Sequence, residues 1–444
     1  MKKYLLICLL LNLASNKCFA FDIETQKVIV PKEFAADLRY IDMALFQAIE
    51  REDDTEKIIC LLQLGANVNL RVIQGTTLLH LAALNGNEEI VKILLKYGSQ
   101  INIADDFSST ALHRAAAMGR ESITLILIKN GASINISNGC GETPLHLAAK
   151  YGHGYIVRLL IESGASVDIV DDFGRTPLFY AIQNDNVNIA QLLIKKGTQI
   201  DATDKDGETP LHLAAYCINS TLLLIENGAP INAKNVNGKT PLHLAINKNV
   251  AQLLIENGAQ VDIIDNDGNT PLHTTARWHS ESMRHLIDNG APINAKNIDG
   301  KTPLHITAEN WGDETMVQFL IENGAQVDIT DNHGRTPLFY AAIYSNLDIM
   351  STLFDIGANV NVVDIDGKTP LHVAAENINE KVIKRLIESG SQVNIKDSLG
   401  NTPIDYARTN GYKNIVQIIK NHLKEIDNQK NDSPIFLHFM SNIC

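Results

Sequence analysis

A six-residue motif recurs every 30 to 34 residues along this chain and limits the folds that it can adopt. Its clearest form is Gly-Glu-Thr-Pro-Leu-His, at residues 141–146 and again at 207–212. A degenerate first repeat at residues 44–69 brings the number of repeats to twelve. Self-similarity with such a period predicts a solenoid, in which each repeat buries its apolar side only against its neighbours. Complete or varied copies of the motif begin at Gly75, Ser108, Gly141, Gly174, Gly207, Gly238, Gly268, Gly300, Gly334, Gly367 and Gly400.

The residues of one repeat predict two short helices. Thr143 can cap the first helix with its hydroxyl, and Pro144 suits the first helical position, where no N–H is needed. Residues 145–149 make this helix apolar, with alanines where a neighbouring helix must approach. Residues 156–161 place apolar side chains at helical spacing in the second helix. Gly164 is expected to end that helix in the left-handed conformation.

The motif, followed in several repeats by Asn-Gly-Ala as at residues 257–259, closely resembles the ankyrin repeat. The resemblance covers residues 42–422 and rests on eleven copies of the motif. It implies an all-α repeat solenoid of about twelve repeats, each a helix–turn–helix followed by a β-hairpin or loop, in a curved stack. Residues 1–20 are then interpreted as a signal peptide, 21–41 as an N-terminal capping segment and 423–444 as a C-terminal tail.

The resemblance also implies where a protein partner would bind, namely at the hairpin tips and at the exposed ends of the first helices. Large apolar and aromatic side chains on a surface are typical interface anchors. The alternative is that these side chains only cover the turns between helices. The candidates at the tips are Phe107, Phe173, Val236, Ile298, His333, Ile365 and Leu399, and those at the ends of first helices are Tyr151, Tyr216, Trp278, Trp311 and Tyr344.

Three of these aromatic residues share a spacing. Trp278, Trp311 and Tyr344 are 33 residues apart and include both tryptophans of the chain. We therefore expect them to lie one above another in consecutive layers. Trp311 stands where a turn glycine is common, so its ring can point in a different direction from that of Trp278.

Histidines at one motif position are interpreted as structural. An imidazole at a fixed position of the repeat is expected to bridge backbone groups of adjacent repeats. Phe179 and Phe339 replace it in two repeats, which a metal or acid–base role would not tolerate. The eight histidines are His80, His113, His146, His212, His243, His273, His305 and His372.

Acidic pairs such as Asp105-Asp106 and Asp171-Asp172 lie in the expected turns. Asp and Asn favour turns because they bond their own backbone, so turn chemistry explains these pairs better than glycoside hydrolysis does. The sequence shows no motif for a nucleophile, a phosphate-binding loop or a zinc site with a supporting context. We therefore predict no catalytic, cofactor-binding or metal-binding residues, and an enzyme with an unrecognised site on the repeats is the third hypothesis.

The charge balance bears on the class of partner. The chain has 38 basic and 51 acidic residues, a formal charge of −13. The first 20 residues contain three lysines and no acid, so without them 35 basic residues face 51 acidic ones, a charge of −16. Such a surface repels phosphate backbones. The expected partner is therefore a protein and not a nucleic acid.

The first twenty residues have the order of an export signal, with Lys2 and Lys3 before an apolar run at 4–11 and small residues at positions 18 and 20. A lipid anchor on Cys18 and a buried N-terminal strand or helix are the alternatives. No later segment is apolar enough to span a membrane. We expect a monomeric mature chain that is secreted or periplasmic.

The remaining cysteines predict no disulfide framework. Cys60, Cys140, Cys217 and Cys444 are far apart and have no CxxC spacing. Cys60 lies in an apolar helical run and is expected to pack as a small core hydrophobe.

These observations predict an exported, non-catalytic scaffold for protein–protein interaction. A signal peptide of bacterial character on such repeats looks like the exported ankyrin proteins of host-associated bacteria, and the target would then be a host protein. The alternative is a structural scaffold of the periplasm or cell surface. Fold analogy supports binding without identifying the partner.

Overall fold

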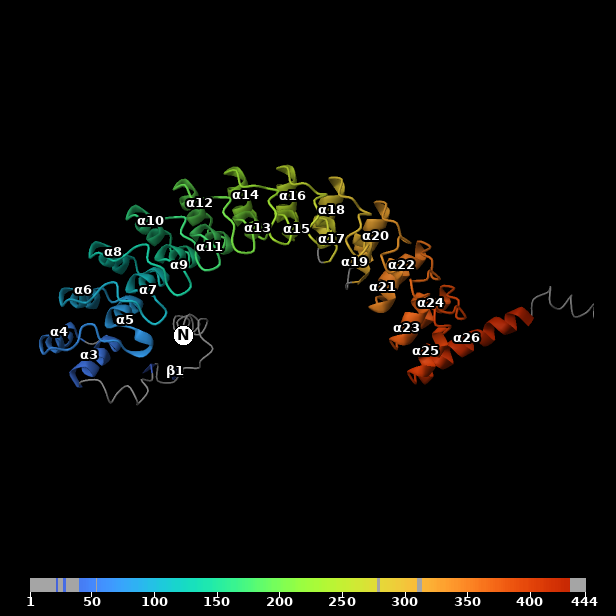
Figure 1. Cartoon of the computed structure of the whole chain (residues 1–444), viewed down its shortest axis with the longest axis horizontal. Helices are drawn as coiled ribbons and strands as arrows, with labels where there is room; N and C mark the ends of the chain where they lie inside the picture. Colours follow the sequence, from blue (N-terminus) through green and yellow to red (C-terminus); the bar gives the residue numbers. More distant parts are fainter. Residues whose placement is uncertain are drawn as a thin grey trace, which may run out of the picture. The chain divides into compact units, whose positions relative to one another are not determined.

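The computed structural model describes residues 21–22, 27–28, 40–52, 54–277, 280–309 and 314–431. Its helices pack in successive pairs, here called layers and named by the motif residue that precedes them (Figure 1). The chain divides into an N-terminal unit that ends at Thr198 and a C-terminal unit that begins at Gln199. Within each unit the first helices form one row and the second helices another, and turns called tips join consecutive layers.

The N-terminal unit holds five layers. Two short strands, β1 (Phe21–Asp22) and β2 (Lys27–Val28), pair in antiparallel register before them. A single turn of 3-10 helix, η1 (Ile73–Gly75), precedes the second layer. The layers are formed by α3 (Tyr40–Glu50) with α4 (Thr55–Gln63), α5 (Leu78–Asn85) with α6 (Glu88–Lys96), α7 (Ala111–Ala117) with α8 (Glu121–Lys129), α9 (Pro144–Lys150) with α10 (Gly154–Glu162), and α11 (Pro177–Gln183) with α12 (Val187–Lys195).

The C-terminal unit holds seven layers. With the five of the other unit they make the twelve helix pairs that the repeats predict, which confirms the all-α repeat solenoid. The last helix continues to Asn431, beyond residue 422. The layers are formed by α13 (Pro210–Ala214) with α14 (Ile218–Glu226), α15 (Pro241–Leu244) with α16 (Lys248–Glu256), α17 (Pro271–Thr275) with α18 (Ser280–Asp288), α19 (Pro303–Glu309) with α20 (Glu314–Glu322), α21 (Pro337–Ile343) with α22 (Leu347–Asp355), α23 (Pro370–Glu376) with α24 (Glu380–Glu388), and α25 (Pro403–Thr409) with α26 (Lys413–Asn431).

Capping and burial explain why each motif begins a helix. In the Gly367 layer Thr369 is the N-cap of α23, and Pro370 occupies the first helical position. Leu371 and Leu386 are fully buried between the two helices and the adjacent layers. Gly390 then ends α24 at a φ of 91°, a left-handed conformation that glycine adopts without strain. The cap, the proline and the glycine stop are all as predicted.

A histidine joins one layer to the next in eight places. In the Gly300 layer the backbone N–H of Thr302 donates to Nδ1 of His305 over 3.1 Å, so Nδ1 accepts and Nε2 carries the proton. Nε2 lies 3.0 Å from the carbonyl oxygen of Arg335 in the next layer and donates to it. All eight motif histidines bond a carbonyl oxygen of the following layer in this way, which confirms their predicted structural role.

Phenylalanine replaces this histidine in two layers, and the N-cap threonine then loses its partner. The hydroxyls of Thr176 and Thr336 are buried and have no hydrogen-bond partner. In contrast, Oγ1 of Thr302 lies 2.8 Å from Nδ1 of His305. The replacement by Phe339 therefore exchanges a polar bridge for apolar packing and leaves Thr336 Oγ1 unsatisfied.

Thr302→Val and Thr336→Val form a matched pair that measures this bridge. Thr302→Val removes a bonded buried hydroxyl, so we expect it to lower the free energy of unfolding by about 1–2 kcal/mol. Thr336→Val removes an unsatisfied one and is expected to leave the free energy unchanged or to raise it by up to about 1 kcal/mol. Urea unfolding of both variants measures the difference. Equal losses would show that the histidine bond adds nothing to the cap.

The cysteine prediction was wrong at Cys60, which is exposed on α4. The buried residues of α4 are Ile58 and Leu62, and a residue two positions from each lies on the opposite side of a helix. Cys140 is also exposed and Cys217 is half-buried, and none of the three forms a disulfide with a described cysteine.

Candidate interaction surface

The tips are rigid turns built around one acidic or amide side chain. Three residues before the motif glycine, Asp331 accepts hydrogen bonds on Oδ1 from the backbone N–H groups of His333 (2.8 Å) and Arg335 (2.9 Å). Asp105 and Asp171, from the acidic pairs of the sequence, hold their own tips in the same way. Their role in turns is confirmed.

Backbone hydrogen bonds also connect consecutive tips. The N–H of Ile365 donates to the carbonyl oxygen of His333 in the preceding layer over 2.9 Å. Equivalent bonds join Ile298 to Asp267 and Val236 to Asp206. Side chains at the tips therefore stand on a fixed backbone.

In the C-terminal unit the predicted tip residues are exposed. Ile298 and Ile365 retain 62% and 67% of their accessible surface, and His333 is exposed beside them. The two tyrosines at the ends of first helices, Tyr216 and Tyr344, are 52% and 44% exposed. All five side chains are thus available to a partner, and their role in binding stays a prediction.

In the N-terminal unit the candidates are less uniform. Phe173 is exposed at its tip, whereas Phe107 and Tyr151 are half-buried. The Tyr151 ring packs beside Lys150, whose Nζ lies 6.0 Å from the ring centroid. Burial raises the pKa of the Tyr151 hydroxyl. Phe173 is therefore the one clear apolar projection among these three.

The two tryptophans, Trp278 and Trp311, lie outside the described residues. The column that they were predicted to form with Tyr344 stays a prediction. The described member of the set, Tyr344, is the C-cap residue of α21, and its hydroxyl donates to Glu309 of the preceding layer over 3.4 Å.

A cluster that sequence reasoning missed lies beside these candidates. In the Gly300 layer, Lys301 and Glu309 form an ion pair of 2.8 Å, and Lys301 Nζ lies 4.5 Å from the ring centroid of Tyr340 in the next layer. The Tyr340 hydroxyl donates to Asp331 over 2.5 Å. Burial, and after it this bond, raise the pKa of Tyr340. The cluster joins first helix, tip and neighbouring layer.

The same cluster occurs at two further junctions. Lys368 pairs with Glu376 over 2.9 Å and lies 4.7 Å from the centroid of the Tyr406 ring. In the Gly141 layer the two charges are exchanged: Glu142 is at the tip, and Lys150 is on the helix, 2.8 Å from it and 5.0 Å from the centroid of the Tyr180 ring. The signal in the sequence is a tyrosine six residues after the motif residue, preceded by a Lys/Glu pair one layer earlier.

The exchanged pair predicts the result of a charge swap in the Gly300 layer. Lys301→Glu alone places two carboxylates together beside the Tyr340 ring, and we expect it to cost about 1–2 kcal/mol of unfolding free energy. The double variant K301E/E309K restores the arrangement found at Glu142 and Lys150 and should recover most of that loss. A double-mutant cycle by urea unfolding measures the coupling. Additive losses would contradict it.

A second missed feature is a strained turn. Ile378, between α23 and α24, has a φ of 60° and is exposed. Gly86, Gly119 and Gly152 take the equivalent position and conformation in other layers. A β-branched residue in this region is strained by about 1–3 kcal/mol. In the sequence, the only sign of this strain is that Ile378 stands at a position that glycine holds in other repeats.

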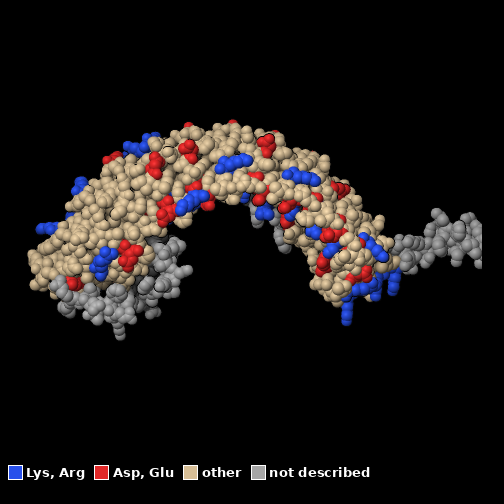
Figure 2. Space-filling view, viewed as in Figure 1, with Lys and Arg blue, Asp and Glu red and all other residues tan. Residues whose placement is uncertain are grey.

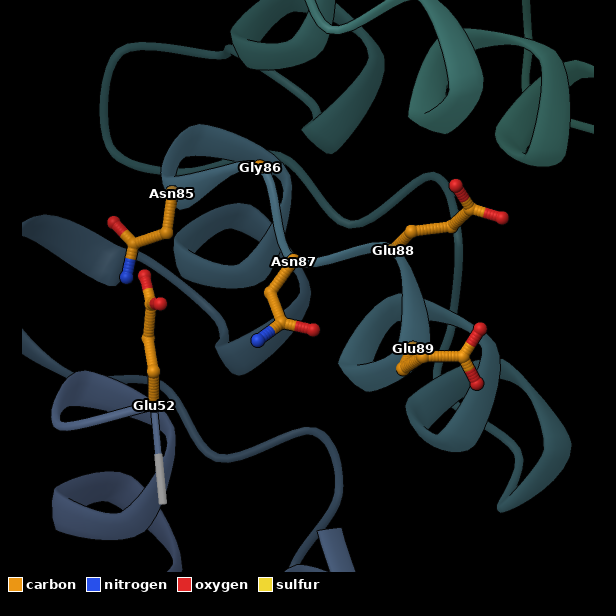
Figure 3. A pocket seen from close by; sticks show the side chains of 6 residues that line it. All are labelled: Glu52, Asn85, Gly86, Asn87, Glu88 and Glu89. Carbon is orange, nitrogen blue, oxygen red and sulfur yellow. The ribbon is translucent and has the colours of Figure 1, made fainter. Parts of the chain in front are cut away.

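The cavity at the start of α6 does not assemble a reactive site. It is a shallow hollow of about 340 Å³ that is open to solvent and lined mostly by polar groups. In Figure 3 the Glu52 side chain points toward Asn85, whereas the Glu88 and Glu89 carboxylates point away from Glu52. Both of the latter pair with Lys92, at 2.7 and 2.9 Å. The carboxylates therefore do not converge on a common point.

Over the described residues, neither the charge distribution nor a metal-ligand cluster nor a membrane-spanning helix marks a site. On the face drawn in Figure 2, acidic and basic side chains are interspersed. Among the residues that the structure describes, no three His, Cys, Asp or Glu side chains are grouped to hold a metal ion. None of the described helices has the length and apolarity needed to cross a membrane.

The chain is similar in sequence and in structure to known repeat proteins. A family model described as ankyrin repeats (3 copies) matches residues 45–138, 133–204, 197–265, 219–297, 279–364 and 356–432. Among solved structures, the chain is similar to the human ASB11 ankyrin repeat domain, with 27% identity and a TM-score of 0.44, over 48% of this chain and 98% of that one. The comparison with curated proteins found no match.

Proposed function

Because the chain belongs to the ankyrin-repeat family, we propose that it is an exported, non-catalytic scaffold that binds another protein through its tips and first-helix ends. Ankyrin repeats are generally protein–protein interaction scaffolds. The proposal places the main binding surface on the C-terminal unit and assigns no reaction to it.

The observation that carries this proposal is the exposure of large apolar side chains at positions where the fold does not need them. Ile298 and Ile365 project from tips in which their backbone N–H bonds the preceding layer. Asp172 makes the same backbone bond at the equivalent position of another layer, so the bond does not require an apolar side chain. Exposed apolar side chains that add nothing to a core are typical of interaction sites. Tyr216 and Tyr344 extend the same surface to the helix ends.

Affinity capture tests the proposal. The exported chain, immobilised, is expected to retain a specific protein, and the variant Y216A/Y344A should retain at least tenfold less of it. Tyr155→Ala is the matched control, since Tyr155 is equally exposed but lies on the second helix α10. The variant W278A/W311A extends the test to the two tryptophans. Capture that is the same in every variant, or absent, would refute the proposed surface.

The source of the captured protein distinguishes the two settings proposed for the scaffold. A partner from host-cell extract supports action on a host protein, as the resemblance to exported ankyrin proteins implies. A partner from an extract of the producing cell's envelope supports a structural role at the cell surface or in the periplasm instead.

Export rests on the order of charged, apolar and small residues in positions 1–20. Fusion of these residues to a reporter that lacks its own signal should carry the reporter out of the cytoplasm. The mature chain should then begin at Phe21. Retention of the reporter inside the cell would exclude the signal peptide.

A further inference from the structure

Apolar and polar residues alternate along the tips of the C-terminal unit. The position concerned is the second residue before the motif glycine, and over five consecutive layers it holds a β-branched residue in every other layer. Val236, Ile298 and Ile365, here called the tip knobs, are 58%, 62% and 67% exposed. The intervening layers hold Asn266 and Asn332 at this position.

The backbone of each knob is held by the preceding tip, and that of Val236 and Ile298 by the following tip as well. Each backbone N–H donates to the preceding tip, as described above. The carbonyl oxygens of Val236 and Ile298 also accept from the side-chain amides of Asn266 (2.9 Å) and Asn332 (2.8 Å). Valine and isoleucine have few side-chain rotamers, so little further entropy is lost when a partner binds them.

The intervening asparagines are also exposed, but their side-chain amides bond the preceding tip. A Cβ atom added at Gly238 would lie 2.5 Å from Oδ1 of Asn266, and one added at Gly300 would lie 2.4 Å from Oδ1 of Asn332. Each carboxamide is therefore folded back against the preceding tip. The row therefore consists of exposed apolar side chains separated by layers with a polar side chain.

Each knob also has a carboxylate beside it. Asp206, Asp267, Asp299 and Asp366 are exposed at the tips and form no ion pair with a described residue. Two nearby lysines are held on the protein itself: Lys234 donates to the carbonyl oxygen of Ile264 (2.9 Å), and Lys296 to that of Thr330 (2.7 Å). Charge complementarity therefore favours a cation next to each apolar group of the partner.

The spacing favours an extended partner chain. Packed helices lie about 8–10 Å apart, so knobs two layers apart are separated by about 16–20 Å. Six residues of extended chain, at about 3.3 Å each, span this distance. An amphipathic helix would instead present apolar residues every three or four positions and set several of them against the polar asparagine layers.

We propose that the tip knobs Val236, Ile298 and Ile365 bind an extended segment of a partner protein that carries an apolar residue beside Lys or Arg at six-residue intervals. This inference rests on the proposed protein-binding function and specifies the chemistry of the partner.

Selection from a displayed library of random twelve-residue peptides tests it on the full chain. The library is first depleted on the variant V236N/I298N/I365N, which places at each knob the residue of the intervening layers. The enriched peptides are expected to share two apolar residues six positions apart, each next to Lys or Arg. Enrichment of apolar residues three or four positions apart, or no enrichment beyond the triple variant, would overturn the inference.

A synthetic peptide with the enriched consensus supplies the quantitative test. Its Kd should rise at least tenfold on V236N/I298N/I365N and stay unchanged on L222N/I356N, which alters two exposed apolar residues, Leu222 within the second helix α14 and Ile356 at the C-cap of α22. D267N/D299N should weaken binding several-fold and reduce its dependence on salt. Equal binding to all variants would refute the knobs while leaving the capture of a protein, which tests the proposed function, unaffected.

Discussion

Lowering the pH from 7 to 4.5 is expected to destabilise the chain by several kcal/mol, through the histidines that join its layers. Burial lowers the pKa of all eight, and it lowers that of His113, His243 and His305 to about 4. A second proton would have to bind Nδ1, which already accepts the threonine N–H. The folded histidines therefore resist protonation.

The sign follows from proton binding in the two states. Below the ordinary histidine pKa of about 6.5, the unfolded chain takes up protons that the folded chain does not, so unfolding becomes more favourable. The stabilisation is complete above about pH 6.5 and is lost as the pH falls toward 4. For each of the three histidines at about 4, the loss is on the order of 3 kcal/mol.

Urea unfolding between pH 7 and 4.5 measures this loss. The control is His305→Phe, which introduces the residue that Phe339 already provides in the next layer. The unfolding free energy of this variant should fall less between pH 7 and 4.5, by the amount that one histidine contributes. A free energy that does not change between pH 7 and 5 would mean that the histidine bridges do not stabilise the stack.

Gly141→Ala is expected to cost about 3 kcal/mol or more of unfolding free energy. Gly141 has a φ of 78°, and an added Cβ would lie 2.5 Å from the backbone nitrogen of Asp172 in the next layer. The left-handed conformation alone costs a non-glycine residue about 1–2 kcal/mol. The clash adds to this cost, because the tips must separate and the bond from Asp172 N–H to Cys140 is lost.

Gly164→Ala is the matched control, measured by the same urea unfolding. Its φ is 97°, but nothing lies within 4 Å of an added Cβ, so only the conformational cost of about 1–2 kcal/mol is expected. Ser108 holds the position of the motif glycine in another layer, with a φ of 58°. The residue that faces its tip in the next layer is Gly139, which has no side chain. Equal losses at Gly141 and Gly164 would mean that the tips do not pack closely.

The sequence predicted those parts of the fold that depend on local chemistry. Thr143 caps α9, Gly164 ends α10, and His146 reaches the carbonyl oxygen of Arg175, all from patterns visible within one or two repeats. Repetition made these predictions secure, because each local preference recurs in many layers. The prediction that Cys60 is buried failed because an apolar run does not by itself indicate which side of a helix is buried.

The surface could be predicted only in part. Exposure of Ile298 and Ile365 followed from their place at the tips, but the contact between Lys301 and the Tyr340 ring depends on side chains 39 residues apart that only layer packing brings together. Ile378 adopts a left-handed turn because the two helices around it are fixed, against its own preference. A single sequence gives no measure of such strain.

By their contacts and exposures, the residues that hold the layers together and the residues that face a partner are separate sets. The most direct test measures urea unfolding and partner capture on one variant, V236N/I298N/I365N. We expect an unfolding free energy within about 0.5 kcal/mol of the unaltered chain per substitution, and at least tenfold weaker capture. Undiminished capture, or a loss of capture matched by a loss of stability, would contradict it.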